Sequence, residues 1–89
     1  MKPALEISFA MRVLFFAQLK DVTGCEAVEL PPPSPSAGDQ LWAVLLEKFP
    51  GLAAHRPNVR LARNWEYADS ATRFADNDEV ALIPPVSGG

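Results

Sequence analysis

The chain has 89 residues, of which 48% are hydrophobic and 21% are charged, so it is long enough for one small globular domain and too short for two. Its formal net charge is −3 and its eight basic residues are scattered, which argues against a nucleic-acid-binding surface. No apolar run approaches the roughly 20 residues of a membrane span, and residues 1–10 do not resemble a secretory signal. We therefore expect a cytoplasmic protein that binds neither nucleic acid nor membrane.

The cysteine and histidine content narrows the chemistry. A single cysteine, Cys25, excludes a disulfide within the chain, and a single histidine, His55, leaves no Cys/His cluster for a metal ion. Cys25 follows Gly24 in a predicted turn, and the sequence indicates no base that would activate its thiol. We expect a loop thiol at Cys25, a surface position for His55, no metal site and no permanently bound cofactor.

Residues 11–17 predict the first strand, because they are rich in β-branched and aromatic side chains. Period-two alternation places one set of these side chains inside, and this set is Met11, Val13, Phe15 and Ala17. Leu14 and Phe16 are then expected on the outer face. The preceding residues 1–10 alternate weakly, so they either lengthen this strand or form a flexible extension.

Three segments lead from this strand to the main helix. Residues 18–23 are predicted to be a short polar connection closed by Gly24. Residues 26–30 alternate glutamate with apolar side chains, as a half-buried strand does. Residues 31–35 contain four prolines, which favour an extended crossover.

The sequence from Ser36 predicts the main helix. The Ser36 side chain is expected to cap it, with Asp39 three residues later as in a capping box. Apolar residues then recur on one stripe of the helix, and this stripe comprises Leu41, Val44, Leu45 and Phe49. Pro50 and Gly51 end the helix, so it is the main body that covers the sheet.

The C-terminal part predicts three further strands. Residues 59–63 form the third strand, Asn64 suits a turn with positive φ, and residues 65–67 form a short return strand. A tight turn at residues 76–78 precedes the last strand, residues 79–83. Alternation divides the last strand into an inward pair, Val80 and Leu82, and an outward set, Glu79, Ala81 and Ile83.

This order of elements predicts an α+β domain, in which one main helix packs across one face of a mixed four- to five-stranded sheet. It is the β-grasp arrangement, with the first and last strands parallel and side by side at the centre. We assign residues 11–84 to this domain, 1–10 to an N-terminal extension and 85–89 to a C-terminal arm.

An apolar surface is expected beside the base of the arm. Phe16, Tyr67 and Ile83 fall on the same outer face of the predicted sheet. Scattered apolar surface residues are common, but a contiguous patch at this place would be a docking surface for partners. The arm residues expected to contact partners are Pro84, Pro85, Val86 and Ser87.

The chemistry is expected at the last two residues, Gly88 and Gly89. Neither has a side chain, so the backbone fits a slot too narrow for any other residue, and the paired prolines stiffen the base of the arm. The α-carboxylate has an ordinary pKa of about 3.3–3.7, so it is an anion at neutral pH and a poor electrophile. Adenylation by ATP on a separate enzyme is the usual way to activate such a group.

Several motifs together resemble the small, sulfur-carrying subunits of molybdopterin synthase, a ubiquitin-like β-grasp family. The motifs are Phe15-Phe16-Ala17, Asn64, Asp78-Glu79-Val80 and Pro84-Pro85-Val86-Ser87-Gly88-Gly89. The departures are Asn77, where glycine is usual, Leu82-Ile83, where aromatic residues are common, the prolines of residues 31–35, and the ten leading residues. None of these departures touches the C-terminal glycines.

The resemblance implies a sulfur-transfer cycle. An adenylyltransferase similar to the ubiquitin-activating enzyme uses ATP to adenylate the Gly89 carboxylate, and a persulfide donor converts it to a thiocarboxylate. The arm then enters the large catalytic subunit and donates sulfur to cyclic pyranopterin monophosphate. The resemblance also implies that the two kinds of subunit form a heterotetramer. The chain is thus not an enzyme on its own but the sulfur-donating subunit of a sulfurtransferase.

Three other functions are compatible with the same features. A sulfur carrier for thiazole or another sulfur metabolite shares the fold, the glycine end and the activation chemistry. A ubiquitin-like protein modifier, whose Gly89 is joined to lysines, is permitted equally by the arm. An interaction module with an inert tail is the third, and it alone would tolerate the loss of Gly89.

Overall fold

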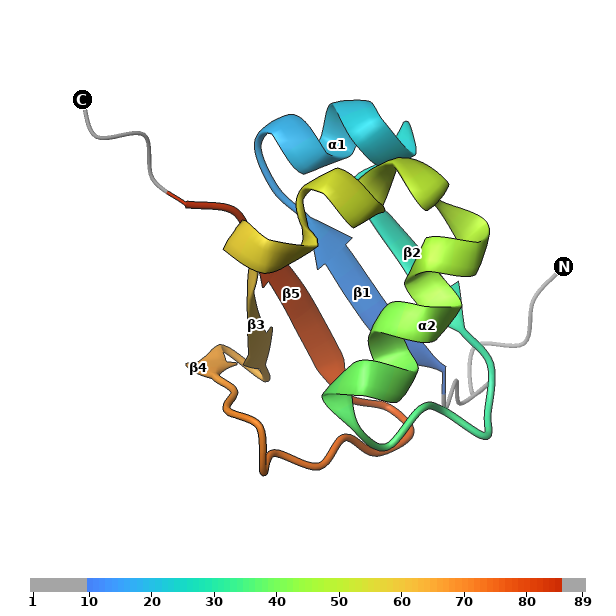
Figure 1. The fold of residues 1–89 in the computed structure, drawn as a ribbon. Coiled ribbons are helices and arrows are strands. Elements are labelled where there is room, and N and C mark those ends of the chain that lie inside the picture. The colour runs from blue at the N-terminus through green and yellow to red at the C-terminus, as the bar shows by residue number, and fades with distance from the viewer. Residues whose placement is uncertain (1–9, 86–89) are drawn as a thin grey trace, which may run out of the picture.

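The chain forms a mixed sheet in the computed structural model, which describes residues 10–85 (Figure 1). The strands are β1 (Met11–Phe15), β2 (Ala27–Leu30), β3 (Arg60–Arg63), β4 (Glu66–Tyr67) and β5 (Glu79–Ile83). The helices are α1 (Gln18–Thr23), α2 (Gly38–Lys48) and two short 3-10 helices, η1 (Pro50–Ala54) and η2 (Arg56–Asn58).

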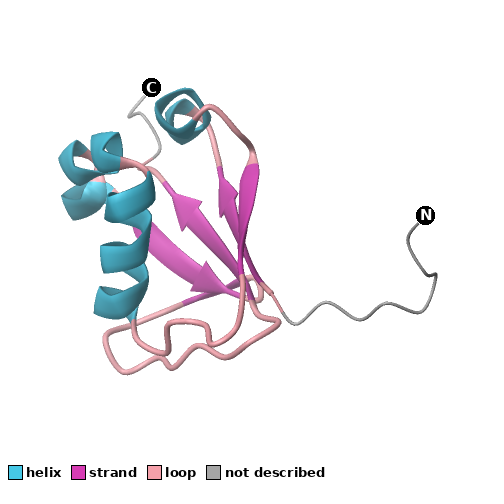
Figure 2. Cartoon of the chain, turned by 90° about the vertical axis from the view of Figure 1, so that its right-hand side faces the viewer, coloured by secondary structure: helices cyan, strands magenta, loops and turns pink. Residues whose placement is uncertain are grey.

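The five strands follow the order β2-β1-β5-β3-β4. The neighbours β1 and β5 are parallel, with Phe15 opposite Leu82, while β2 and β3 flank them as antiparallel partners. Helix α2 crosses one side of the sheet, and in the described part of the chain the opposite side carries no helix (Figure 2). The predicted β-grasp fold, with parallel first and last strands, is therefore confirmed. We call the side opposite α2 the outer face.

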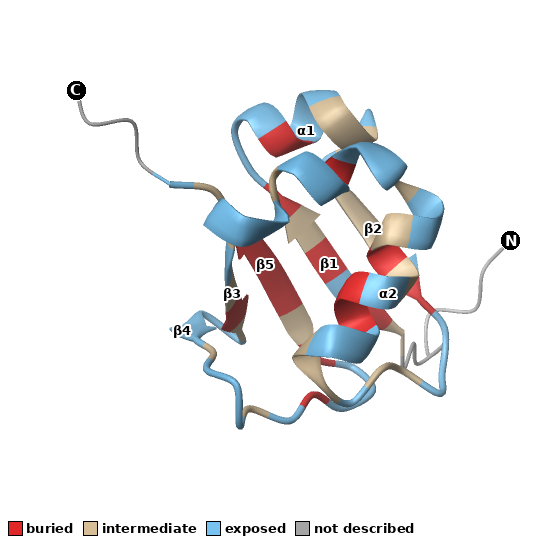
Figure 3. Cartoon of the chain, viewed as in Figure 1, coloured by how far each residue is buried: buried red, intermediate tan, exposed pale blue. Residues whose placement is uncertain are grey.

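The core lies between the sheet and α2 (Figure 3). Its buried side chains include Met11, Val13, Phe15, Val80 and Leu82 from the sheet and Leu41, Trp42 and Leu45 from α2. The Phe15 ring meets Phe49 edge-on, with ring centroids 5.5 Å apart. Burying each large apolar side chain stabilises the fold by about 1.5–3 kcal/mol. The alternation predicted for β1 describes the core as far as Phe15, but Ala17, which was predicted to point inward, is exposed, because the strand ends at Phe15 and the chain turns with φ of 52° at Ala17. In the stripe predicted for α2, Leu41 and Leu45 are buried, and Val44 and Phe49 are half-buried.

The connection after β1 differs from its prediction. Gln18–Thr23 form helix α1 and not an irregular polar link. Leu19 is fully buried in the core, and Gly24 closes the helix with φ of 76°, its N–H donating to the Lys20 carbonyl at 2.7 Å. A helical turn is the conformation that lets this short polar segment bury Leu19 while its backbone stays hydrogen-bonded.

The start of α2 also differs from its prediction. Ser36 does not cap the helix, which begins at Gly38 after Ala37. Ala37 remains extended because it forms a β-bridge with Arg73, and this delays the first helical turn. Gln40 Oε1 instead accepts hydrogen bonds from the backbone N–H of Ser36, at 3.1 Å, and from its hydroxyl.

The boundaries of the predicted domain and arms depend on residues that the structure does not describe. Strand β1 begins at Met11 and β5 ends at Ile83, while residues 1–9 and 86–89 lie outside the described part. The division into extension, domain and arm therefore stays a prediction. Within residues 10–85, no helix is long and apolar enough to cross a membrane.

Candidate functional site

The outer face carries an apolar patch that runs from the β3–β4 turn, beside the start of β5, to the end of β5 from which the C-terminal arm departs. We define the outer apolar patch as Leu14, Phe16, Trp65, Tyr67 and Ile83. Phe16 is 38% exposed, Tyr67 60% and Trp65 70%, and these are all the large hydrophobic residues classed as exposed between residues 10 and 85. The large apolar surface that the described domain leaves in water is thus gathered at one place.

Trp65 joins the parts of this patch. One hollow of about 290 Å³ is lined by Leu14, Phe16 and Trp65 among others. A second, of about 180 Å³, is lined by Ala62, Trp65, Tyr67 and Ile83. The three predicted docking residues therefore line two hollows of the outer face, and the Trp65 side chain borders both.

Sequence reasoning did not identify Trp65, which it placed in a strand over residues 65–67. The strand β4 contains only Glu66 and Tyr67, and Trp65 occupies the turn before it with φ of 72°. The sequence did carry a signal for this position. Turn positions with positive φ favour small or polar residues, so an aromatic residue directly after Asn64 is unusual and could have marked Trp65 as a functional candidate.

Ala81 lies on the outer face, as the alternation predicted, but it is shielded from water. Ala81 is 3% exposed, although it lies between Leu14 of β1 and Ala62 of β3 in register on the outer face. Its methyl group is short, so larger neighbours on the same face shield it from water. Ala62, which pairs with Tyr67, is 4% exposed for the same reason, and the two alanines form the floor of the patch.

The base of the arm leaves the sheet at the patch. Ile83, the last residue of β5, and Pro84 are half-buried, and Pro85 is exposed. The remaining predicted arm residues lie outside the described part, and they are Val86, Ser87, Gly88 and Gly89. Their assigned roles in partner binding and chemistry stay predictions.

A buried carboxylate ties together the turns at the start of β5, at the end of the sheet opposite the arm. Asp78, which is 7% exposed, accepts hydrogen bonds from Arg63 Nε at 2.8 Å, from the Ala75 backbone N–H at 2.8 Å and from Asn64 Nδ2 at 3.1 Å. Asn64 Oδ1 in turn accepts from the Glu79 N–H at 2.9 Å. Two motifs on which the resemblance depends, Asn64 and the segment from Asp78, thus form one network.

The same network sets the pKa of Asp78. Burial acts to raise the pKa of this carboxyl group, but the hydrogen bonds from Arg63, Ala75 and Asn64, with the positive charge of Arg63, outweigh burial and hold the pKa below its ordinary value. Asp78 is therefore ionised at neutral pH and acts as a structural acceptor.

The other candidates have structural surroundings. Cys25 is half-buried, and its backbone carbonyl accepts a hydrogen bond from the Thr23 hydroxyl at 2.9 Å. His55 is half-buried at the junction of η1 and η2 and not on the open surface, because the chain folds back there between two short helices. Among residues 10–85, no three His, Cys, Asp or Glu side chains gather in a metal-binding group.

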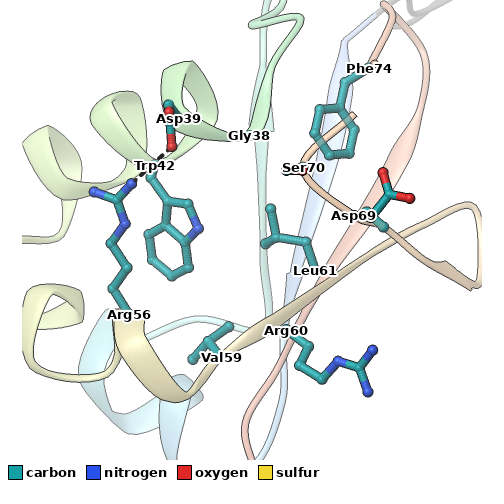
Figure 4. A pocket seen from close by; sticks show the side chains of 11 residues that line it. Gly38, Asp39, Trp42, Arg56, Val59, Arg60, Leu61, Asp69, Ser70 and Phe74 are labelled. Carbon is teal, nitrogen blue, oxygen red and sulfur yellow. Dashed lines mark hydrogen bonds and ion pairs between the residues drawn. The ribbon is translucent and has the colours of Figure 1, made fainter. Parts of the chain in front are cut away.

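A polar hollow of about 360 Å³ lies at the start of α2 (Figure 4). Arg56 there donates to Asp39 at 3.2 Å and lies 5.5 Å from the centre of the Trp42 ring. This hollow shares no lining residue with the two hollows of the outer face. Arg56 is already paired with Asp39, so we assign no chemistry to this hollow.

The parallel central pair of strands and the single covering helix define the class of ubiquitin-like β-grasp proteins. Within this class the chain belongs to the ThiS family, whose family model matches residues 13–89. The molybdopterin synthase sulfur carrier subunit of Arabidopsis thaliana is 39% identical over 82 residues, which cover 92% of this chain and 85% of that protein. The family resemblance predicted from the sequence is thereby confirmed.

Two solved structures share the fold at similar identity. The small archaeal modifier protein SAMP1 from Haloferax volcanii superimposes with a TM-score of 0.76 at 29% identity, covering 90% of this chain and 99% of that one. A complex of subunits 1 and 2 of the molybdopterin-converting factor from Helicobacter pylori contains a chain that matches with a TM-score of 0.68 at 30% identity. The match covers 90% of this chain and 99% of that one.

Proposed function

We propose that this chain is the sulfur carrier subunit of a molybdopterin synthase and that the carboxylate of Gly89 carries the sulfur. The observation that carries this proposal is the match of the family model through Gly89, in a chain whose sulfur-carrier relative from Arabidopsis thaliana is 39% identical. The fold supports it, because β5 leads from the centre of the sheet to Pro84 and Pro85 beside the outer apolar patch.

The proposed charging reaction has two stages. Attack of the Gly89 carboxylate on the α-phosphate of ATP forms an acyl-adenylate and releases pyrophosphate, which turns a poor electrophile into a good one. A persulfide sulfur then displaces AMP. Cleavage of the remaining S–S bond requires two electrons from a thiol, and it leaves a thiocarboxylate on Gly89.

We assign the remaining steps of the cycle to partner proteins. The described domain has no metal-binding group among residues 10–85, and its one cysteine needs no role in the proposed cycle. We assign adenylation and ATP binding to a ubiquitin-activating-like enzyme, and the catalytic side chains to the large synthase subunit, with two copies of each subunit in a heterotetramer. The chain supplies sulfur to cyclic pyranopterin monophosphate and is not an enzyme alone. Its cytoplasmic location stays a prediction.

The test is intact-mass measurement after incubation with ATP, the activating enzyme and a sulfur source. We expect the mass gain of one oxygen-to-sulfur exchange, and no gain when Gly89 is deleted. Addition of the large subunit and the pterin precursor should then return the chain to its starting mass and produce molybdopterin. A gain that persists without Gly89 would refute the proposal.

The two terminal glycines provide matched variants. We expect Gly88→Ala and Gly89→Ala to slow sulfur transfer strongly, because a methyl group restricts φ and ψ and widens the arm. The midpoint of thermal unfolding should move little, since the last few residues of a domain generally make few stabilising contacts. A large fall in the unfolding midpoint would instead mean that the arm packs on its own domain.

A protein modifier is the second candidate, favoured by the likeness to SAMP1. It differs in the acceptor, because the activated Gly89 would form an isopeptide bond with a lysine amine. Conjugates that resist reduction and lack sulfur would support it.

A carrier for thiazole synthesis would become charged but would release no sulfur to the pterin precursor.

A further inference from the structure

The turn between β3 and β4 places a bulky residue where the backbone favours glycine. Asn64 and Trp65 have φ of 48° and 72°, so they form a two-residue hairpin loop with positive φ at both positions, for which Asn-Gly is the preferred sequence. Asn tolerates this conformation, but a bulky residue is strained in it. The sequence thus places an indole at the position where glycine would be more stable.

Hydrogen bonds hold this turn against the strain. The Asn64 N–H donates to the Glu79 carbonyl at 2.7 Å, and the Asn64 side chain bonds both to the Glu79 N–H and to the Asp78 carboxylate. Strained backbone persists only where the surrounding structure over-determines it. The network therefore sets the position of the turn, and with it the position of Trp65 on the outer face.

The indole is held out in water and not packed into the domain. Trp65 is 70% exposed, whereas Trp42, the other tryptophan, is 6% exposed in the core. Trp65 also borders both hollows of the outer apolar patch. A large aromatic side chain that is mostly exposed and extends from a turn fixed by hydrogen bonds has the properties of an interface anchor.

We propose that Trp65 is an anchor of this chain for the large synthase subunit, inserted into an apolar pocket of that subunit. The inference rests on the proposed function and extends it to a residue outside the predicted docking set. Trp65 would specify the fit between the two subunits, while the Asn64 and Asp78 network would act as the positioning device.

The reach of the arm argues for this partner. From Ile83, residues 84–89 span at most about 22 Å when fully extended. A subunit that receives the Gly89 thiocarboxylate must therefore contact the domain near Ile83, which lines the same hollow as Trp65. A related chain at 30% identity forms a complex with subunit 2 of its molybdopterin-converting factor, so the large subunit is the occupant to test.

The experiment measures the dissociation constant for the large subunit of the same organism by titration calorimetry. We expect Trp65→Gly and Trp65→Asn to weaken binding at least tenfold, with an unfolding midpoint equal to or above that of the wild type. Both replacements tolerate the backbone of the turn, and the asparagine variant excludes glycine flexibility as the cause. Trp65→Phe is the matched control, and it should bind within about threefold of the wild type because an aromatic anchor remains.

A second measurement follows burial of the indole directly. In a Trp42→Phe background, Trp65 is the sole tryptophan of the chain. Its emission should shift to shorter wavelength when a large subunit without tryptophan is added, because the ring moves from water into an apolar pocket. Emission that stays unchanged in a complex that forms normally would overturn the inference.

The outcomes separate this inference from the proposed function. If wild type binds the large subunit and both Trp65 variants bind equally well, the anchor is overturned and the sulfur-carrier function stands. If wild type neither binds nor becomes charged, both are overturned. Impaired charging with unchanged large-subunit binding would mean that Trp65 contacts the activating enzyme. A dimer that the wild type forms and the variants do not would mean that Trp65 contacts a second copy of the chain. Either outcome contradicts the inference.

Discussion

Phe15 and Phe16 are adjacent in the chain but lie in opposite surroundings, which makes them a sensitive test of how β1 is oriented. Phe15 is 1% exposed and packs on Phe49, whereas Phe16 is 38% exposed and lines a hollow of the outer face. Replacing each with alanine removes the same atoms from the core in one variant and from the outer apolar patch in the other.

The structure sets the expected loss for Phe15→Ala. Truncating a fully buried phenylalanine costs about 3–5 kcal/mol, because it removes apolar burial and leaves a cavity. A chain of this length has a total stability of about 4–13 kcal/mol. We therefore expect the unfolding midpoint to fall by roughly 12–40 °C, so a large fraction of the variant is unfolded at growth temperature if stability lies at the low end.

The expected loss for Phe16→Ala is smaller. Because the residue is already 38% exposed, its partial burial in the free domain contributes roughly 1–2 kcal/mol. Covering the exposed remainder on binding contributes about 0.6–1.1 kcal/mol, or roughly three- to sixfold in the dissociation constant. The partner can gain more from Tyr67 and Trp65, which leave larger fractions of their side chains in water.

Urea denaturation of both variants measures the first difference, and calorimetric titration with the large subunit measures the second. The Phe15→Ala domain should be compared at a temperature where it is still folded. Equal destabilisation by the two substitutions would mean that the alternation along β1 is shifted by one residue. Unchanged binding of Phe16→Ala would mean that its place in the patch is incidental.

Three further predictions concern stability and charging. Asp78→Asn should lower the free energy of unfolding by about 1–3 kcal/mol at pH 7 by weakening the charge-assisted bond to Arg63. The pKa of Asp78 is lowered in the folded state, so the difference in the free energy of unfolding between wild type and variant should be full above about pH 4 and shrink as the pH falls through the folded pKa. A difference that is constant down to pH 2 would contradict the role of this network. Gly24→Ala should cost about 1 kcal/mol because φ is 76° at the end of α1, as thermal unfolding will show, and a neutral result would mean that the turn relaxes. Cys25→Ser should gain sulfur at the wild-type rate in the intact-mass assay, since the proposed acceptor is Gly89, and failure to gain it would point to the thiol.

Much of the fold was accessible from local patterns in the sequence. Alternation over residues 11–15 and 79–83 identified the buried faces of β1 and β5, because side chains of a strand point alternately to its two sides, but it failed at Ala17, which lies beyond the end of β1 and is exposed. Asn64 was correctly placed in a turn with positive φ, since its short polar side chain tolerates that conformation. The chemistry assigned to Gly88 and Gly89 stays a prediction from the sequence, because residues 86–89 lie outside the described part of the chain.

The tertiary structure decided those features that depend on residues distant in the sequence. The extended conformation of Ala37 depends on its bridge with Arg73, and the shielding of Ala81 depends on neighbouring strands. Neither pairing can be predicted from the residues adjacent in the sequence. The same holds for Trp65, whose turn is held by Asp78 through a contact that only the folded sheet creates. Hydrophobic periodicity reports which side of an element is buried, but the exposure of one side chain is set by what packs beside it.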